Sequence, residues 1–345
     1  MTSSCRRWSR TLRPSRVPRA CAALVALACL AAGSAAQTLK LATLVPEGSI
    51  WDRSERELGA AIQKATGGRV KFQVYPGGVA GDEPDLLRKL RVGQLQAVLF
   101  SAPGLGDIDP AFFLFQVPLL FESDAEVLHV LDAMRPELEK RLEAKGCVLL
   151  HWTNVGWLRI FGSKPVASYA DFKARKQFVW GTEGRLASWY QELGLQPVSL
   201  SATDVLTGLE TGLIETLPVT PLAALALQWF RSAPYMLDHR FAPLLGALVV
   251  SKSSWEKLKP EDRAEIQRLA RETERKLFAD VPKQEEQALA EMAKRGLSIA
   301  KEPASDAEAW MKLASEFQRR FRTHTVPPEI FDQATKLLEE HRGRR

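Results

Sequence analysis

Cysteine is scarce in this sequence, and its placement excludes a disulfide framework. The 345-residue chain contains four cysteines, and three of them, Cys5, Cys21 and Cys29, lie within the first 36 residues. Only Cys147 lies in the remainder, so no disulfide can form inside it. Because Cys147 belongs to the apolar run "GCVLLHW", which is typical of a buried strand, we interpret it as an inert core thiol.

Catalytic and metal-binding patterns are also missing. The sequence has no HExxH, no cysteine pair for zinc, no GxSxG and no glycine loop for phosphate, and no two histidines have metal-binding helical spacing. Most carboxylates alternate with lysine and arginine, as on a solvated surface. The sequence therefore predicts neither an enzyme nor a cofactor or metal site. The five histidines are His129, His151, His239, His324 and His341.

Acidic residues are absent from residues 1–36, which have the pattern of an export signal. Six arginines precede the apolar run "CAALVALACLAAG", and the small residues Ser34 and Ala36 follow it. Such a run is too short to cross a bilayer, and the small residues offer a cleavage site. We expect a cleaved signal peptide over residues 1–36 and a location in a bacterial periplasm. A lipid anchor on Cys29 is disfavoured because "ALAC" is a poor lipoprotein motif.

The excess of positive charge belongs to this signal. The whole chain has 47 Lys+Arg and 41 Asp+Glu, and removing the six arginines of residues 1–36 leaves equal numbers of each sign. The remainder is formally neutral, which argues against nucleic acid as a partner. It also has no apolar run of transmembrane length.

Alternating patterns predict an α/β fold. Residues 39–45 read as a strand, 50–66 as a helix and 70–75 as an alternating strand, and the strand–helix order then continues. This order is typical of a parallel sheet covered by helices. The 309 residues after the signal are many for one core, so we expect two lobes. We also expect Pro282 to kink or break a long helix near the C-terminal end.

Aromatic residues are the most distinctive candidates for a site. Trp51, Trp157 and Trp180 each lie at or just beyond the carboxyl end of a predicted strand, where open α/β sheets hold ligands. Phe178 and Trp180 are two residues apart in "FVWGTEGR" and therefore share one face of their strand. Trp189 and Trp229 fit the apolar spacing of helices, and we assign them to the core.

Several segments in the same order resemble the solute-binding proteins of TRAP transporters (tripartite ATP-independent periplasmic transporters), of the dicarboxylate or DctP-like type. The segments run from Leu39 to about Arg295 and include "LATLVPEGSIW", "GGRVKFQVYPGG", "LLRKLRVGQLQAVLFS", "VPLLFES", "GSKPVASYADFKARK" and "LVVSKSSWEKLKPEDRAEI". The resemblance implies two α/β lobes around a cleft and a long bracing helix. It also implies a receptor that captures a small molecule and delivers it to the membrane permease subunits.

The chain departs from this family where the family binds a carboxylate. The usual arginine after a "DLKGLK"-like turn falls on Phe178 here. A second family arginine falls on Leu158, with Arg159 one residue away and so on the opposite face. The usual asparagine is Thr220. These differences imply an atypical branch with a partly hydrophobic or aromatic ligand, and "FVWGTEG" resembles a branch associated with a tetratricopeptide partner protein.

Alternatives stay open beside this interpretation. An ordinary organic-acid receptor would use Arg185 or Arg159 for the charge, and a secreted enzyme or a scaffolding protein could share the fold. We expect lobe I to contain residues 37–154 and about 245–281, and lobe II to contain residues 155–244 and about 282–345. The candidate ligand-binding residues are Trp51, Ser101, Trp152, Trp157, Phe178, Trp180, Arg185 and Thr220.

Overall fold

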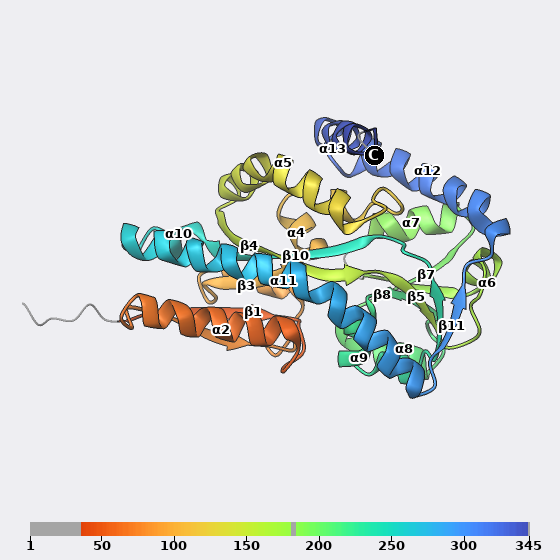
Figure 1. Ribbon diagram of the computed structural model, residues 1–345, viewed down its shortest axis with the longest axis horizontal. Coiled ribbons are helices and arrows are strands. Elements are labelled where there is room, and N and C mark those ends of the chain that lie inside the picture. Colours follow the sequence, from red (N-terminus) through yellow and green to blue (C-terminus); the bar gives the residue numbers. More distant parts are fainter. Residues whose placement is uncertain (1–35, 181–183, 344–345) are drawn as a thin grey trace, which may run out of the picture. The chain divides into compact units, whose positions relative to one another are not determined.

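Two β-sheets organise the chain (Figure 1). The structure, a computed structural model, describes residues 36–180 and 184–343, and of residues 184 and 185 it describes the backbone alone. The first sheet has the strand order β2-β1-β3-β10-β4, in which β1 pairs in parallel with β2 and β3 while β10 runs antiparallel to its neighbours. Its strands are β1 (Gln37–Thr43), β2 (Val70–Tyr75), β3 (Ala97–Ser101), β4 (Cys147–Trp157) and β10 (Pro243–Ser251).

The second sheet has the order β11-β9-β5-β8-β6-β7. Within it β6 is parallel to β7 and β8, whereas β5 is antiparallel to β8 and β9. Its strands are β5 (Arg159–Gly162), β6 (Lys176–Trp180), β7 (Gln196–Leu200), β8 (Thr216–Val219), β9 (Tyr235–Asp238) and β11 (Ser298–Lys301). The expected α/β class with two groups of strands is confirmed.

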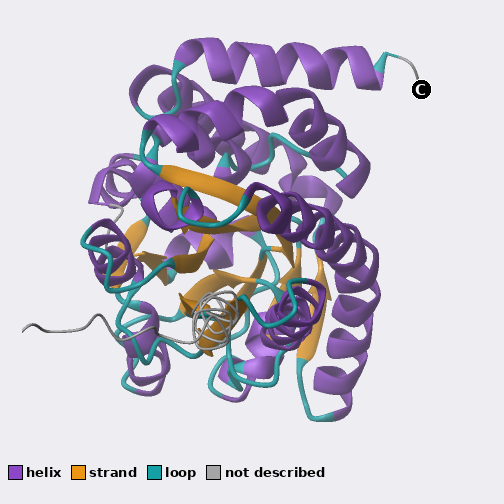
Figure 2. Cartoon of the chain, turned by 90° about the vertical axis from the view of Figure 1, so that its left-hand side faces the viewer, coloured by secondary structure: helices purple, strands orange, loops and turns teal. Residues whose placement is uncertain are grey.

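Helices surround both sheets (Figure 2). Side-chain hydrogen bonds cap the beginnings of helices. For example, the Ser49 side chain caps α2 by accepting a hydrogen bond from the Asp52 N–H at 3.3 Å. The α-helices are α2 (Ile50–Ala65), α3 (Glu83–Arg91), α4 (Ala102–Ile108), α5 (Asp124–Ala144), α6 (Tyr169–Ala174), α7 (Gly184–Glu192), α8 (Val205–Glu210), α9 (Pro221–Ala226), α10 (Lys252–Trp255), α11 (Pro260–Lys294), α12 (Ala307–His324) and α13 (Pro328–Arg342). The 3-10 helices are η1 (Pro110–Gln116), η2 (Ala202–Asp204), η3 (Trp229–Arg231) and η4 (Ala304–Asp306). Within the described ranges, no helix has both the length and the apolar character that crossing a membrane requires.

The chain passes between the sheets along two neighbouring strands. β4 leads directly into β5, and β9 leads back into β10. β4 and β10 pair with a register shift at Leu244/Leu245, opposite Asn154 and Gly156. Gly156 has a φ of +105°, a left-handed conformation that suits glycine. This irregularity turns the strand as it leaves the first sheet.

Helix α11 spans the molecule as one element. It packs against α2 and β4 on the side of the first sheet and against α9 beside the second. The expected break at Pro282 does not occur, because the helix continues from Pro260 to Lys294 through it. Apolar contacts of Leu277 and Val281 with Ile50 and Trp51 hold this part of the helix in place.

The C-terminal helices α12 and α13 pack on helices that belong to both sheets. α12 packs on α7, where Phe321 meets Trp189 at 5.5 Å between ring centroids and Phe317 meets Tyr190 at 5.1 Å. α13 packs on α5, which connects β3 and β4 of the first sheet, as Figure 1 shows at the top of the view. One apolar core accordingly runs continuously from the first sheet to the second.

Candidate functional site

A cavity of about 170 Å³ lies where strand ends of both sheets meet. Leu44 and Val45 follow β1, and Ser101 ends β3 in the first sheet. From the second sheet, the carboxyl end of β6 and Val219 at the end of β8 contribute. Ligands of open α/β sheets bind at such carboxyl ends, so the cavity has the position expected of a ligand site.

The wall of this cavity is apolar and rich in aromatic rings. Among the described residues that line it, none carries a formal charge. The aromatic members come from five different elements and one connection. They are Trp51, Phe178, Trp180, Tyr190, Trp229, Phe241 and Phe321. Such a wall favours a ligand with apolar surface.

Phe178 and Trp180 form a pair on one face of β6. Their ring centroids are 5.1 Å apart at an interplanar angle of 72°, an edge-to-face arrangement. Both rings line the cavity, but they differ in burial. Phe178 is 3% exposed and packs into the apolar cluster with Phe161 and Leu217, whereas Trp180 is half-buried. Phe178 thus serves the core and the cavity together.

Trp51 and Ser101 line the cavity with their polar atoms already engaged. The Trp51 Nε1 donates to the Asn154 carbonyl at 2.9 Å, which fixes the indole ring. The Ser101 hydroxyl donates to Glu83 Oε2 at 2.7 Å, and the Ser101 N–H donates to Oε1 at 2.6 Å. Burial raises the pKa of Glu83 to about 7, and the hydrogen bonds from Ser101 oppose this rise. A titratable carboxyl therefore lies directly behind the cavity wall.

Trp152, Trp157 and Thr220 lie elsewhere. Trp152 is fully buried against Phe112 and Phe115, with ring centroids at 5.8 and 6.1 Å. The Thr220 hydroxyl caps α9 by accepting from the Ala223 N–H at 3.3 Å. Neither side chain is among those that line the cavity.

Trp157 points away because of the turn at Gly156. Its Nε1 donates to Asp124 at 3.0 Å, and the Arg240 guanidinium lies 5.3 Å from its ring. Val155 and Leu158 line the cavity instead, which shows that the two-residue alternation of β4 is interrupted between them. The two-residue period of a strand puts Trp157 on the same face as Val155. The sequence therefore could not reveal that the alternation is interrupted and that Trp157 points away from the cavity.

Arg159 is committed to an ion pair outside the cavity. Its Nε donates to Asp238 at 2.9 Å, and its side chain is largely buried. Burial lowers the pKa of Arg159, although the Asp238 charge opposes this change. Leu158 occupies the cavity side and Arg159 does not line it. The side chain of Arg185, in the first turn of α7, lies outside the described residues, as do residues 1–35 with Cys29.

Several lining residues had no signal in the sequence. Gln116 ends the 3-10 helix η1, and Trp229, which we assigned to the core, contacts both the core and the cavity. Phe321 reaches the cavity from α12, far along the chain. Tertiary packing brings these residues together, and no local pattern marks them.

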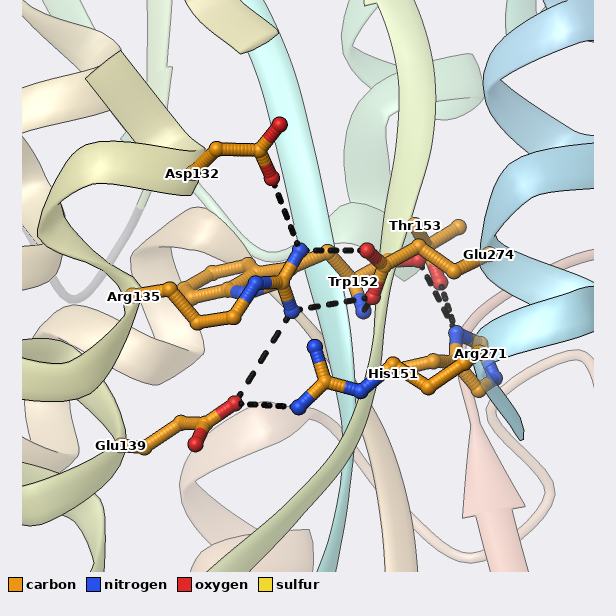
Figure 3. A network of polar contacts seen from close by, with 8 residues as sticks. All are labelled: Asp132, Arg135, Glu139, His151, Trp152, Thr153, Arg271 and Glu274. Carbon is orange, nitrogen blue, oxygen red and sulfur yellow. Dashed lines mark hydrogen bonds and ion pairs between the residues drawn. The ribbon is translucent and has the colours of Figure 1, made fainter. Parts of the chain in front are cut away.

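A separate polar network lies behind β4 (Figure 3). Arg135 bridges Glu274, Asp132 and Glu139, and Glu274 also accepts from the Trp152 N–H at 2.8 Å. His151 contacts the buried Glu55 at 3.0 Å. Burial acts to lower the pKa of His151, but Glu55 outweighs it and raises the pKa. None of these residues lines the cavity, and their ion pairs join α5, α11, α2 and β4, which indicates a structural network.

Metal chemistry has no support here. Across residues 36–180 and 184–343, no three histidine, cysteine or carboxylate side chains gather closely enough to hold a metal ion.

Comparison with known proteins finds relatives in several bacteria. A protein of Salmonella typhimurium, uncharacterized protein YiiZ, is 26% identical over 210 residues, which are 60% of this chain and 64% of that protein. A solute-binding protein of Chromohalobacter salexigens is 26% identical over 284 residues, which cover 81% of this chain and 78% of that one.

A solved structure shares the fold. The TRAP periplasmic solute-binding protein of Xanthobacter autotrophicus, crystallised with β-D-galacturonate, superposes with a TM-score of 0.80. It is 20% identical, and the match covers 87% of this chain and 99% of that one. This result confirms the expected solute-binding fold.

The family model named DctP, bacterial extracellular solute-binding protein, family 7, matches residues 41–324. That range is most of the chain, and it contains every strand of both sheets except the beginning of β1. The protein therefore belongs to family 7 of the bacterial extracellular solute-binding proteins, the DctP family, which consists of solute receptors and not of enzymes.

Proposed function

We propose that this protein is the extracytoplasmic receptor of a TRAP transporter and that it captures a small, partly hydrophobic or aromatic ligand in the cavity at the strand ends. The observation that carries the proposal is the uncharged, aromatic wall formed by the described lining residues. Phe178 stands where the resemblance puts the family's carboxylate-binding arginine, and this supports the proposal that the chain belongs to an atypical branch of its family.

The energetics favour an uncharged apolar body over a carboxylate. A buried carboxylate without a partner costs several kcal/mol, whereas apolar contact contributes about 25 cal/mol per Å² of covered surface. Glu83 behind Ser101 adds negative charge near the wall whenever it is ionised, which further disfavours an anion. An engineered apolar cavity of about 150 Å³ binds benzene, so a cavity of about 170 Å³ suits a compact ring.

The second candidate is an organic-acid receptor. The Xanthobacter autotrophicus protein of the same fold carries a sugar acid, β-D-galacturonate. In this chain Arg159 pairs with Asp238 outside the cavity, so Arg185 would have to supply the positive charge. Arg185 follows "FVWGTEG" directly and lies in the first turn of α7, next in the chain to the cavity-lining Leu186.

The proposal extends to export and to the partners of the receptor. Residues 1–36 would be removed as a signal peptide, the mature receptor would act in the periplasm, and the loaded receptor would dock on the membrane permease subunits. A tetratricopeptide partner protein is a further proposed contact. Intact mass of the exported protein tests the first step, with cleavage near Ala36 expected and a lipid on Cys29 contradicting it.

A thermal-shift screen separates the two ligand classes. The panel contains neutral aromatic compounds, aromatic acids, aliphatic acids and sugar acids. A ligand present at about 100 times its Kd stabilises the folded state by about 2.7 kcal/mol. We expect neutral aromatic compounds to stabilise the protein. Stabilisation by acids alone, abolished by Arg185→Met, would establish the organic-acid receptor instead.

A further inference from the structure

Glu83 is a buried carboxyl group without the positive partner that other buried acidic groups have. Of the eight buried acidic side chains in the described part of the chain, six form an ion pair with an arginine or a histidine at 3.3 Å or less. These six are Asp52, Glu55, Asp109, Glu126, Asp262 and Glu274. Glu285 forms no such pair, but the charges of Arg159 and Arg240 act on it. Glu83 forms no ion pair with any described residue, and none of the main groups that act on it is positive.

Neutral hydrogen-bond donors hold the Glu83 carboxyl group in place. The Ser101 hydroxyl and N–H, at the end of β3, donate to its two oxygens at 2.7 and 2.6 Å. The Gly104 N–H of α4 donates to it as well. A Cβ at Gly104 would lie 2.8 Å from the carboxyl carbon, so the glycine leaves room for this group. The neighbouring Asp82 carboxylate adds a second negative charge. The donors fix the carboxylate, and its charge stays uncompensated.

This uncompensated charge lies directly behind the cavity wall. Ser101 lines the cavity, and so does Pro103 at the beginning of α4. The Glu83 carboxyl group is therefore one hydrogen bond away from a lining residue. A charge acts through an apolar wall with much less screening than through water, so its field reaches the cavity without direct contact. A carboxyl group with a perturbed pKa beside a cavity is a candidate for a functional role.

The aromatic wall supplies what a cation needs from the other sides. The faces of tryptophan, tyrosine and phenylalanine rings attract positive charge, and tryptophan does so most strongly. Trp51, Trp180 and Trp229 line the cavity, and no described lining residue carries a positive charge that would repel a cation. The Trp51 N–H, the positive edge of its ring, already donates to the Asn154 carbonyl.

We propose that the ligand supplies the missing positive charge, and that it is a compact ammonium compound whose apolar body fills the cavity. Its cationic group would lie against the aromatic rings, on the side of Ser101, and the field of Glu83 would favour it. This inference rests on the proposed apolar receptor and adds the charge of the ligand.

A matched pair of probes tests the charge preference. Phenyltrimethylammonium and tert-butylbenzene have nearly the same shape, and only the first carries a charge. We expect the protein to bind the cation about tenfold more tightly at about pH 8, as measured by quenching of the cavity tryptophans and by calorimetry. Burial raises the pKa of Glu83 to about 7, so the carboxyl group loses its charge below this pH. The preference should therefore shrink to about threefold at about pH 6.

A second measurement on the unmodified protein identifies the titrating group. A bound cation favours the ionised form of Glu83, so phenyltrimethylammonium should release protons at neutral pH, whereas tert-butylbenzene should release none. Calorimetry in two buffers with different enthalpies of protonation measures this release. Glu83→Gln should abolish the release and lower the preference to about twofold at every pH.

Glu47→Gln is the matched control. Glu47 follows the cavity-lining Pro46 in the chain, but its side chain is 80% exposed, so water and salt screen its charge. This variant should keep the tenfold preference and the proton release. A preference that is unchanged by Glu83→Gln and by pH would overturn the role of Glu83.

The remaining outcomes distinguish this inference from the proposed function. Equal affinity for the two probes at every pH would overturn the ammonium ligand and leave the apolar receptor in place. Binding of phenylacetate with neither of the two probes bound would overturn the apolar receptor and the ammonium ligand together.

Discussion

Phe178 and Trp180 share one face of β6, but Phe178 is more deeply buried than Trp180. We therefore expect Phe178 to contribute more to folding stability and Trp180 to contribute more to ligand binding. Trp180 is half-buried at the strand end and lines the cavity with one face. Trp180→Ala should therefore weaken binding of an aromatic ligand more than tenfold, a change of only about 1.4 kcal/mol. The free energy of unfolding should change little, because few core contacts are lost. Titration calorimetry and chemical denaturation measure the two effects.

Phe178→Ala is the matched control for this prediction. Phe178 is 3% exposed within a core cluster, so its truncation should cost about 3–5 kcal/mol of folding stability. If Trp180→Ala were as destabilising as Phe178→Ala and left affinity unchanged, the stretch would belong to the core alone and the aromatic cavity would lose its main support.

Glu285 makes folding stability depend on pH. Burial raises its pKa to about 7, while the Arg159 charge and the hydrogen bond from the Trp157 N–H act in the opposite direction. Its folded-state pKa exceeds the value of 4.5 of an unperturbed glutamate, so the folded state binds more protons than the unfolded state between these values. Stability from this group is thus present below about pH 4.5 and is lost as pH rises towards 7.

Glu285→Gln should remove this component while keeping an acceptor for the Trp157 N–H. The free energy of unfolding of the variant, relative to the original protein, should rise with pH across that window by about 2–3 kcal/mol. Denaturant titrations at several pH values give the measurement. Glu286→Gln, on the exposed side of the same helix, serves as the control. A parallel pH dependence for Glu285→Gln and the original protein would contradict the assignment.

At the scale of elements, the turn between β4 and β5 depends on Gly156. Its φ of +105° disfavours any other residue, and a Cβ at this position would lie 2.1 Å from Glu285 Oε1. Gly156→Ala should therefore destabilise the fold by about 2 kcal/mol or more, measured by chemical denaturation.

A double variant separates the two causes. Gly156→Ala combined with Glu285→Ala removes the contact with the carboxyl but keeps the backbone strain, so part of the penalty should remain. A Gly156→Ala protein as stable as the original would mean that β4 can straighten, and the outward direction of Trp157 would then need another cause.

At the scale of the whole molecule, the two lobes should close around the ligand. The β4–β5 and β9–β10 passages connect the sheets, and α11 contacts elements of both. A hinge at these passages would bring the strand ends together over a bound ligand. Small-angle scattering with a saturating aromatic ligand from the thermal-shift panel should show a smaller radius of gyration than without it.

The control for closure is a variant with weakened binding. At a ligand concentration that saturates the original protein but lies below the Kd of the variant, Trp180→Ala should keep the radius of the unliganded state. An unchanged radius for the original protein under saturating ligand would argue against closure by a hinge.

Local patterns in the sequence were sufficient for much of the fold. The strand predicted at 39–45 overlaps β1 (Gln37–Thr43), and the capped helix after Ser49 and the alternating strand at 70–75 match α2 and β2. These predictions succeed because alternation, helical spacing and capping are properties of neighbouring residues. The two-residue period of a strand also predicted that Phe178 and Trp180 share one face of their strand and that Leu158 and Arg159 lie on opposite faces.

Tertiary structure decided what depends on distant contacts. A single left-handed glycine, Gly156, reversed the side on which Trp157 lies, and packing against α2 kept α11 continuous through Pro282. Gln116 and Phe321 became neighbours of β6 around one cavity only after the chain had folded. Periodicity specifies which face a residue occupies within its own element, whereas a cavity is formed by faces of many elements, whose meeting is set by the packing of the whole core.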